Sequence, residues 1–459
     1  MATTRLTVGE KLSYGIADFA LNICYTTLGF YLLFFLVNVA GIKVEIAGII
    51  FLVARAWDAV SDYLMGMISD RTISRYGKRK VYLLFGAIPL GIAFFLLWIV
   101  PFESSTALIV YYFCMTLVFN TAFTVVAVPY NAMMPELSQD YHERLNISGY
   151  RISLTFLGNL MAAAGVALIV DFIFPGKTAY RQSYPVMGVI FGILIAVCVY
   201  VTYFRVHPRI ETIADRSRSF WKSIVSTFIE VLGLREFRII MGMFLFNMIG
   251  LDVIMATMIF FLKDVILISE DMTFVMMGIP LVVAVLSAPL WVYIGKRLGK
   301  QMAYIIGAIY FVLILLLCLV IKPGNTPLMF VIMVLAGIGI SVAQVVPWSI
   351  IPDVIEIDEY EHGVRREGAF YGISTFLYKT ASAIAIALAS FFLGAFGYVE
   401  NSPTPQPESA QLALRILMSI IPGIMLLASA WFVKVLPINR ERFNEILAIL
   451  EERRKTAPN

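Results

Sequence analysis

The sequence predicts an all-α polytopic membrane protein with twelve transmembrane helices in two pseudo-symmetric six-helix bundles. Of its 459 residues, 60% are hydrophobic and only 14% are charged. A soluble globular protein has about 45–50% apolar and about 25% charged residues. Apolar runs of about 20 residues, long enough to cross a bilayer, recur along the whole chain. This composition excludes a soluble enzyme, a nucleic-acid-binding protein and a disordered scaffold, because too few charges are available to cover their surfaces.

The twelve predicted spans lie between charged breaks or breaks rich in glycine and proline. We place them near residues 12–37, 44–67, 80–101, 106–134, 147–171, 184–205, 237–262, 273–295, 302–321, 326–350, 369–394 and 411–436. The longest charged stretch separates the sixth span from the seventh. We therefore predict two six-helix bundles, at residues 1–205 and 237–436. A cytoplasmic linker at residues 206–236 joins them, and a cytoplasmic tail at residues 437–459 follows.

The distribution of basic residues orients these spans. With a cytoplasmic N-terminus, most of the 35 Lys and Arg residues fall in segments on the inside and few fall in outside loops. Short cytoplasmic loops of membrane proteins carry this excess of Lys and Arg. We therefore predict that both termini are cytoplasmic, in a multi-pass protein of the bacterial inner membrane or the plasma membrane.

The two halves of the chain contain related motifs at a nearly constant offset. Val128–Tyr130 leads to Pro135–Glu136 in the first half, and Val346–Trp348 leads to Pro352–Asp353 in the second. Two such matches indicate an internal duplication. Parallel six-helix repeats are a known plan of transporters, with the substrate site near the middle of the bilayer.

Three segments carry a family resemblance. Gly66–Arg79 (GMISDRTISRYGKR) resembles the loop signature of the major facilitator superfamily. Phe51–Asp62 (FLVARAWDAVSD) is similar to the second-helix motif of the glycoside–pentoside–hexuronide:cation symporters, the melibiose permease-like family, and Asp358–Gly368 resembles the loop before its eleventh helix. The resemblance implies a major facilitator fold and a secondary active transporter, not an enzyme. It further implies symport of a sugar, glycoside or uronide with Na⁺ or H⁺ by alternating access.

Charged residues inside the predicted spans are the candidates for mechanism. A charge at the centre of a bilayer costs about 2.5–3.5 kcal/mol on insertion scales, so each such residue needs a reason. Seven residues qualify: Asp18, Arg55, Asp58, Asp62, Arg151, Asp252 and Lys379.

Asp58 and Asp62 form the predicted cation site. They lie four residues apart and therefore share one face of a helix, with Arg55 one turn earlier. Two close carboxylates repel each other unless they share a proton or hold a cation, and oxygen ligands suit a hard cation. Hydroxyl oxygens are available from Ser61 and Thr124. We expect Na⁺, Li⁺ or H⁺ here, with both aspartates as metal ligands if the ion is Na⁺; static acids held by basic residues are the alternative.

The predicted substrate-binding residues of the first half are Asp18, Asn22, Tyr25 and Arg151. Asp18 and Asn22 share a helical face with Tyr25, and a carboxylate accepts hydrogen bonds from vicinal hydroxyls. The family resemblance implies a sugar-binding role at the position of Asp18. The alternative is a structural ion pair between Asp18 and Arg151.

Three residues of the second half complete the predicted substrate site. Lys379 lies near the middle of its span, and the resemblance implies that it holds the charge of the cation-site acids when the ion is absent. Lys379 and Arg55 are thus the predicted charge partners of that site. Trp348 offers an aromatic platform. Asp252 is either a second binding or protonation site or a polar residue lining the cavity.

The resemblance also implies a conformational latch in the first cytoplasmic loop. Its predicted members are Asp70, Arg71 and Arg79.

The same fold suits a second cargo. The sequence has Ala127, Asn131 and Gln344 where melibiose permease-like members carry further sugar-binding residues, which favours a lysolipid or another amphipathic solute. Asp18 favours the sugar. In either case we expect a monomer in the lipid bilayer that binds a small-molecule substrate and a monovalent cation, without nucleic acid and without another cofactor.

Overall fold

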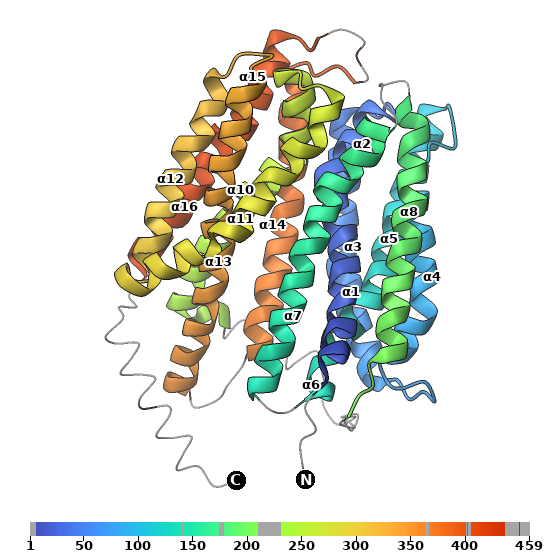
Figure 1. Ribbon diagram of the computed structural model, residues 1–459, viewed down its shortest axis with the longest axis vertical. Helices are drawn as coiled ribbons and strands as arrows, with labels where there is room; N and C mark the ends of the chain where they lie inside the picture. The colour runs from blue at the N-terminus through green and yellow to red at the C-terminus, as the bar shows by residue number, and fades with distance from the viewer. Residues whose placement is uncertain are drawn as a thin grey trace. The chain divides into compact units, whose positions relative to one another are not determined.

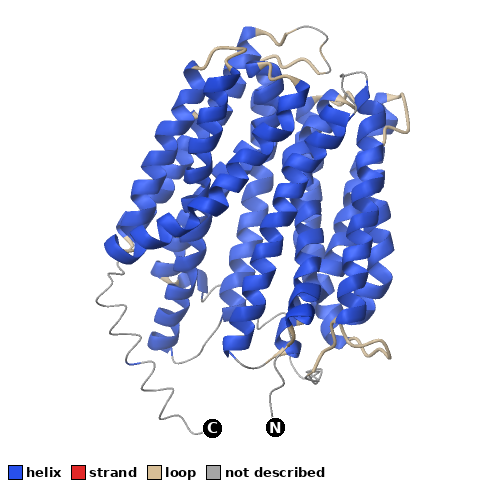
Figure 2. Ribbon diagram, in the orientation of Figure 1, coloured by secondary structure: helices blue, strands red, loops and turns tan. Residues whose placement is uncertain are grey.

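The computed structural model describes residues 6–138, 141–173, 179–209, 231–362, 367–400, 402, 405–436 and 449. The regular structure of this part of the chain is entirely helical, as Figure 2 shows. Of the predicted linker only residues 206–209 and 231–236 are described. Of the predicted tail only residue 449 is described.

The helices of the first half begin with a continuous run, because α1 (Val8–Thr27), the π-helical turn η1 (Leu28–Leu32) and α2 (Leu33–Asn38) follow one another without a break. After them come α3 (Val44–Arg71), α4 (Lys80–Leu96), α5 (Ser105–Ala132), α6 (Met134–Leu137), α7 (Tyr141–Leu160), the π-helical turns η2 (Met161–Gly165) and η3 (Leu168–Ile173), and α8 (Tyr180–Arg205). Three pairs pack side by side: α1 with α7, α3 with α5, and α4 with α8 (Figure 1).

The second half continues the same pattern of long apolar helices. Its elements are α10 (Arg235–Phe260), η5 (Phe261–Ile266), α11 (Glu270–Leu298), α12 (Lys300–Val320), α13 (Thr326–His362), α14 (Glu367–Ala395), α15 (Glu408–Met418) and α16 (Ile420–Val435). Here α12 packs against both α13 and α16.

The chain forms two compact units, and the first of them contains segments of both sequence halves. The first unit comprises Met1–Ser217, Met255–Leu281 and Ile386–Leu414. The second unit comprises Arg218–Ile254, Val282–Ala385 and Arg415–Asn459. The proposed division into two six-helix bundles stays a prediction.

Ten helical segments of the described chain are long and apolar enough to cross a membrane. The other two predicted spans correspond to α3, which is long but carries Arg55, Asp58 and Asp62 in its middle, and to α4, which has 17 residues. Both are helical, so the multi-pass architecture is confirmed, while the count of twelve and the orientation of the termini stay predictions.

Local sequence signals explain how the helices begin and how they approach one another. Thr7 caps α1, because its hydroxyl accepts the backbone N–H of Glu10 while the Glu10 carboxylate accepts the N–H of Thr7. Gly91 of α4 faces Gly192 of α8 so closely that a Cβ on Gly91 would lie 2.5 Å from the Gly192 carbonyl oxygen. Small residues of this kind allow the backbones of membrane helices to touch.

Candidate functional site

The two carboxylates of α3 converge on one hydroxyl group of α5. The Thr124 Oγ1 lies 2.8 Å from the Asp62 Oδ1 and 3.4 Å from the Asp58 Oδ1. The Ser61 hydroxyl lies 3.2 Å from the same Thr124 oxygen and donates to the Asp58 carbonyl. Asp58 is only 2% exposed. All four residues predicted for the cation site therefore lie within one cluster of oxygen atoms, which we call the α3–α5 oxygen cluster.

Arg55 borders this cluster. Its Nη1 lies 3.9 Å from the Asp58 Oδ2, and its guanidinium lies 5.0 Å from the centre of the Tyr25 ring. The long distance to Asp58 makes this a loose ion pair, because charge-assisted hydrogen bonds are about 2.7–2.9 Å long. Arg55 therefore offsets part of the negative charge of the cluster without forming a short hydrogen bond to Asp58. Tyr25, predicted to bind substrate, lies against this arginine.

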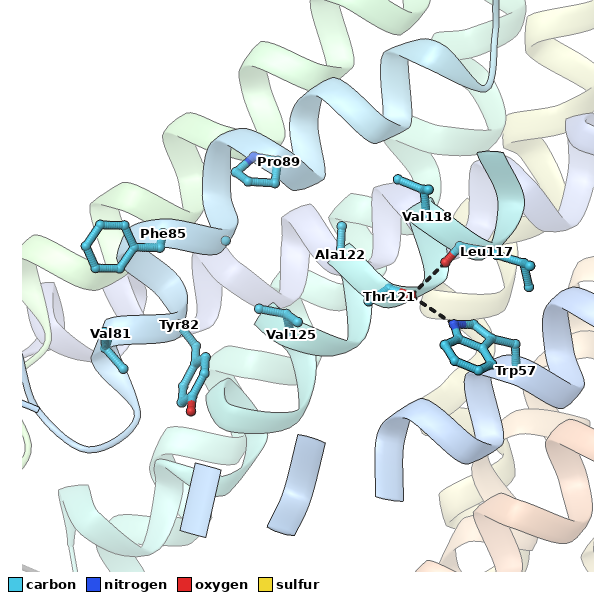
Figure 3. A pocket seen from close by; sticks show the side chains of 11 residues that line it. Trp57, Val81, Tyr82, Phe85, Pro89, Leu117, Val118, Thr121, Ala122 and Val125 are labelled. Carbon is cyan, nitrogen blue, oxygen red and sulfur yellow. Dashed lines mark hydrogen bonds between the residues drawn. The ribbon is translucent and has the colours of Figure 1, made fainter. Parts of the chain in front are cut away.

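A second hydrogen bond between α3 and α5 supports the geometry of the cluster. Trp57 precedes Asp58 on α3, and its indole N–H donates to the Thr121 hydroxyl of α5 over 2.8 Å. Thr121 lies one helical turn before Thr124 on the same helix. The bond therefore fixes α3 against α5 beside the carboxylates, at the edge of the apolar pocket in Figure 3.

That pocket has a volume of about 570 Å³ and almost entirely apolar walls. Its lining comes from α3, α4 and α5 and includes Phe85 and Val118, which are 62% and 47% exposed. In a membrane protein such a surface faces lipid chains, so the pocket is not the site of a polar solute.

Asp18 and Arg151 form a closed cluster in the first unit. The Arg151 guanidinium donates to both carboxylate oxygens of Asp18, with its Nη2 at 3.0 Å from Oδ1, and the Tyr130 hydroxyl donates to Oδ2 over 2.6 Å. Arg151 also donates to the Asn131 side-chain oxygen over 2.6 Å and lies over the Tyr14 and Tyr130 rings. The ion pair weighed as an alternative is therefore present, with Tyr130 as an additional donor.

Asn22 has protein partners as well. Its side-chain amide donates to the Asp18 carbonyl over 2.8 Å and to the Thr155 hydroxyl of α7 over 3.2 Å. The bond to Thr155 joins α1 to α7, the helix that carries Arg151. Asp18, Asn22 and Arg151 are thus brought together by one helix pair.

In the second unit, Asp252 of α10 accepts hydrogen bonds from α14. The Tyr378 hydroxyl lies 3.2 Å from its Oδ1, and the Ser382 hydroxyl donates to its Oδ2. Asp252 is 7% exposed, and Lys379 follows Tyr378 on α14. The structure therefore places two predicted substrate residues of the second half on two contacting helices. The side chain of Trp348 lies outside the described residues.

Of the predicted latch, Arg79 makes a defined contact. Its guanidinium pairs with Glu136 of α6 at 3.1 Å and donates to the Ala132 carbonyl at the end of α5. Arg71 ends α3 in an exposed position. The side chain of Asp70 lies outside the described residues.

The sequence did not predict the buried ion pair between Asp171 and Lys263. Asp171 and Lys263 form a salt bridge with side-chain exposures of 1% and 6%. The predicted spans ended at 171 and 262, whereas the helical segments run over Asn146–Ile173 and Arg235–Ile266. Asp171 is thus the last residue of its predicted span, and Lys263 lies one residue beyond its own. The apolar residues on either side of each charge were the available signal for the longer boundaries.

The comparisons with known proteins agree with this architecture. The profile described as "MFS/sugar transport protein" matches residues 13–440. An uncharacterized symporter of Synechocystis sp. is 26% identical, over 99% of this chain and 98% of the relative. The sodium-dependent lysophosphatidylcholine symporter 1-A of Danio rerio is 27% identical, over 95% of this chain and 87% of the relative.

Among solved structures, the nucleoside transporter NupG has the same fold. The two chains superpose with a TM-score of 0.65 at 15% identity, over 94% of this chain and 100% of that chain. The expected resemblance to symporters is confirmed across nearly the whole sequence. The chain therefore belongs to the MFS/sugar transport protein family and is a multi-pass membrane transporter of the symporter type.

Proposed function

We propose that the protein couples the movement of a sugar, glycoside or uronide to Na⁺ that binds at the α3–α5 oxygen cluster. The observation that carries the proposal is the position of the Thr124 hydroxyl between the carboxylates of Asp58 and Asp62. Two carboxylates and two hydroxyls supply hard oxygen ligands, and a cation between the carboxylates relieves their repulsion.

The coupling step follows from charge balance. Without the ion, nearby positive charge offsets that of the two carboxylates, and the Arg55 guanidinium, 3.9 Å from Asp58, contributes to it. When Na⁺ binds, its charge neutralises part of the charge of the carboxylates. The attraction between the carboxylates and the nearby basic side chains becomes weaker, and the helices that carry these side chains can change position. A ligand shifts a conformational equilibrium only through its different affinity for the two states, and the neutralised cluster supplies that difference.

The residues that this proposal assigns to solute binding form two polar groups, one in each unit. Asp18, Arg151 and Tyr130 form a hydrogen-bonding surface in the first unit, and Asp252 with Tyr378 forms another in the second. Groups of this type recognise vicinal hydroxyls and, through Arg151, a carboxylate. In the proposed cycle Arg151 and Tyr130 exchange part of their bonding with Asp18 for bonds to the solute.

The coupling ion is tested without knowledge of the solute. Purified protein is heated in detergent in NaCl and in choline chloride at equal ionic strength. We expect Na⁺ to raise the unfolding temperature of the wild type and to have no such effect on Asp58→Asn or Asp62→Asn. Thr116→Ala is the matched control, because the Thr116 hydroxyl of α5 donates to the Tyr112 carbonyl of its own helix, and this variant should keep the Na⁺ effect. Equal stabilisation of all four proteins by Na⁺ would contradict the assignment, and LiCl and acid buffer test the other two ions.

The solute class is tested by uptake into proteoliposomes. The panel contains α- and β-glycosides, pentoses and a hexuronate, each supplied with an inward Na⁺ gradient. We expect accumulation above equilibrium for at least one of them, and its loss on collapse of the gradient. A sugar that only equilibrates would exclude symport of that sugar.

A lysolipid is the second candidate, favoured by the relatives named sodium-dependent lysophosphatidylcholine symporters. Lysophosphatidylcholine is added to the same panel as a labelled probe. Na⁺-dependent capture of this probe, with no response to any sugar, would replace the sugar by the lysolipid and leave the proposed cation site unchanged.

A further inference from the structure

Asp171 and Lys263 join the two sequence halves inside the first unit. The Lys263 ammonium donates to the Asp171 carboxylate and to the Tyr180 hydroxyl, and Tyr180 also donates to Asp171 over 2.9 Å. The ammonium lies 4.4 Å from the centre of the Tyr180 ring and 5.4 Å from that of Phe34. Asp171 and Tyr180 come from η3 and α8 of the first half, whereas Lys263 comes from η5 of the second.

A second polar contact joins the two halves, through the residue that follows Lys263. The Tyr398 hydroxyl donates to the Asp264 carboxylate over 2.7 Å and accepts from the Asn38 side-chain amide over 3.0 Å. Burial raises the pKa of Tyr398 well above its usual value, and the neighbouring Asp264 charge acts in the same direction. The hydroxyl therefore remains a neutral donor at physiological pH. Asp264 is the residue after Lys263, so one turn of η5 reaches both contacts.

A third contact is a close approach of α3 and α14. A Cβ on Gly48 would lie 2.7 Å from the Ser390 Cβ, and a Cβ on Gly394 would lie 1.8 Å from the Glu45 Oε1. No side chain fits at Gly394 without displacing this carboxylate. The start of α3 therefore lies directly against the end of α14.

These contacts all lie at one end of the first unit, away from the N-terminus (Figure 1), where α2 ends and η5 begins. The basic residues predict that this end faces the outside. Because alternating access requires the two halves to separate at one membrane face at a time, contacts between halves at this end close the outer path.

The chemistry of the pair suits repeated opening. A buried ion pair adds little net stability over apolar residues of the same size, because both charges lose their hydration. The Asp171 Oδ2 and the Tyr184 hydroxyl are both buried, and neither has a hydrogen-bond partner in the described part of the chain. Water that enters on opening satisfies these atoms and hydrates both charges, which compensates for the broken salt bridge.

We propose that Asp171, Lys263 and Tyr180 form the outer gate of the transporter, closed when the ion pair is buried and open when it is separated and hydrated. The gate rests on membership of a transporter family and on alternating access. It does not depend on which solute or ion is carried, and its test contains neither.

The test measures the gate directly with spin labels. Cysteines at Ser104 and Ser409, both exposed and both in the first unit, are labelled in a Cys114→Ser background, because Cys114 is the exposed native thiol among the four. We expect one short distance in the parent protein. In Asp171→Asn and in Lys263→Met, most molecules should show a longer distance between the two labels. The charge-swapped variant Asp171→Lys with Lys263→Asp should restore the short distance.

Two further variants keep the test decisive. The double variant Asp171→Leu with Lys263→Met leaves no unpaired buried charge, so it is expected to fold and still to show the longer distance. Lys11→Met breaks the buried Lys11–Glu143 pair, which lies within the first half, and should leave the short distance unchanged. An unchanged distance in the folded double variant, or a longer one in Lys11→Met, would overturn the gate.

Discussion

At the residue scale, Asp18 and the pair of Asp58 and Asp62 have different kinds of partner. Asp18 accepts three donor groups from Arg151 and Tyr130. Asp58 and Asp62 share one hydroxyl, that of Thr124, and Arg55 lies 3.9 Å from Asp58. Two carboxylates this close repel each other unless a proton or a cation lies between them, which is the electrostatic basis of the proposed cation site.

Thr124 provides a graded test of the α3–α5 oxygen cluster. A hydrogen bond to a charged group contributes about 1.5–3 kcal/mol, so Thr124→Ala should raise the Na⁺ concentration for half-maximal thermal stabilisation by about tenfold or more. Thr124→Ser keeps the hydroxyl and should remain close to the wild type. If alanine and serine at this position behave alike, the hydroxyl is not a ligand of the ion.

Arg151 tests how much of the Asp18 cluster is structural. Arg151→Met leaves the Asp18 carboxylate buried without its cation, and breaking a buried pair in this way costs about 3–5 kcal/mol. We expect a clearly lower unfolding temperature in detergent. Adding Asp18→Asn removes the unpaired charge and should recover most of the loss. An unchanged unfolding temperature in Arg151→Met would show that water replaces the guanidinium.

At the element scale, helix packing depends on a few small residues. Helices α4 and α8 contact each other at Gly91 and Gly192. A Cβ added to either glycine would lie 2.5 or 2.6 Å from the carbonyl oxygen of the other. Side chains larger than hydrogen would push the two helices apart. The sequence pattern contains no such information, because both glycines lie in runs that are apolar on every side.

Gly91→Ala should therefore destabilise the protein by about 1–3 kcal/mol through overpacking. The control is Gly149→Ala in α7, where a new Cβ meets nothing within 4 Å and helix propensity favours alanine by about 1 kcal/mol. Thermal unfolding of the two variants in the same detergent should move in opposite directions. A stabilised Gly91→Ala would mean that α4 and α8 separate without cost.

At the scale of the whole molecule, the orientation of the chain is a prediction that chemistry can check. Ser104 precedes α5 in a predicted outside loop, and Ile73 follows α3 in a predicted inside loop, where it is 81% exposed. In the Cys114→Ser background, a membrane-impermeant maleimide should label Ser104→Cys in intact cells. It should label Ile73→Cys only after permeabilisation. The reverse pattern would invert the topology and place the gate at the inner face.

Part of the α3–α5 oxygen cluster was predictable because Asp58, Ser61 and Asp62 are neighbours in sequence. Asp58 and Asp62 share a helix face by their spacing alone, and the packing of α5 brings Thr124 to hydrogen-bonding distance of Asp62. The partners of Asp252 were not predictable in detail. Tyr378 and Ser382 lie more than a hundred residues away, and only the packing of α10 against α14 brings them to this carboxylate.

The sequence by itself determined the membrane class, the helical segments and the face that carries the paired carboxylates. These follow from local hydropathy and from the period of the helix, which act over a few residues. Only the tertiary structure decided which charges meet. Asp171 and Lys263 are 92 residues apart, and each ends an apolar run that gives no sign of the other. Their pairing depends on the contact between the two sequence halves, because a buried charge needs a counter-charge that only a packed neighbour supplies.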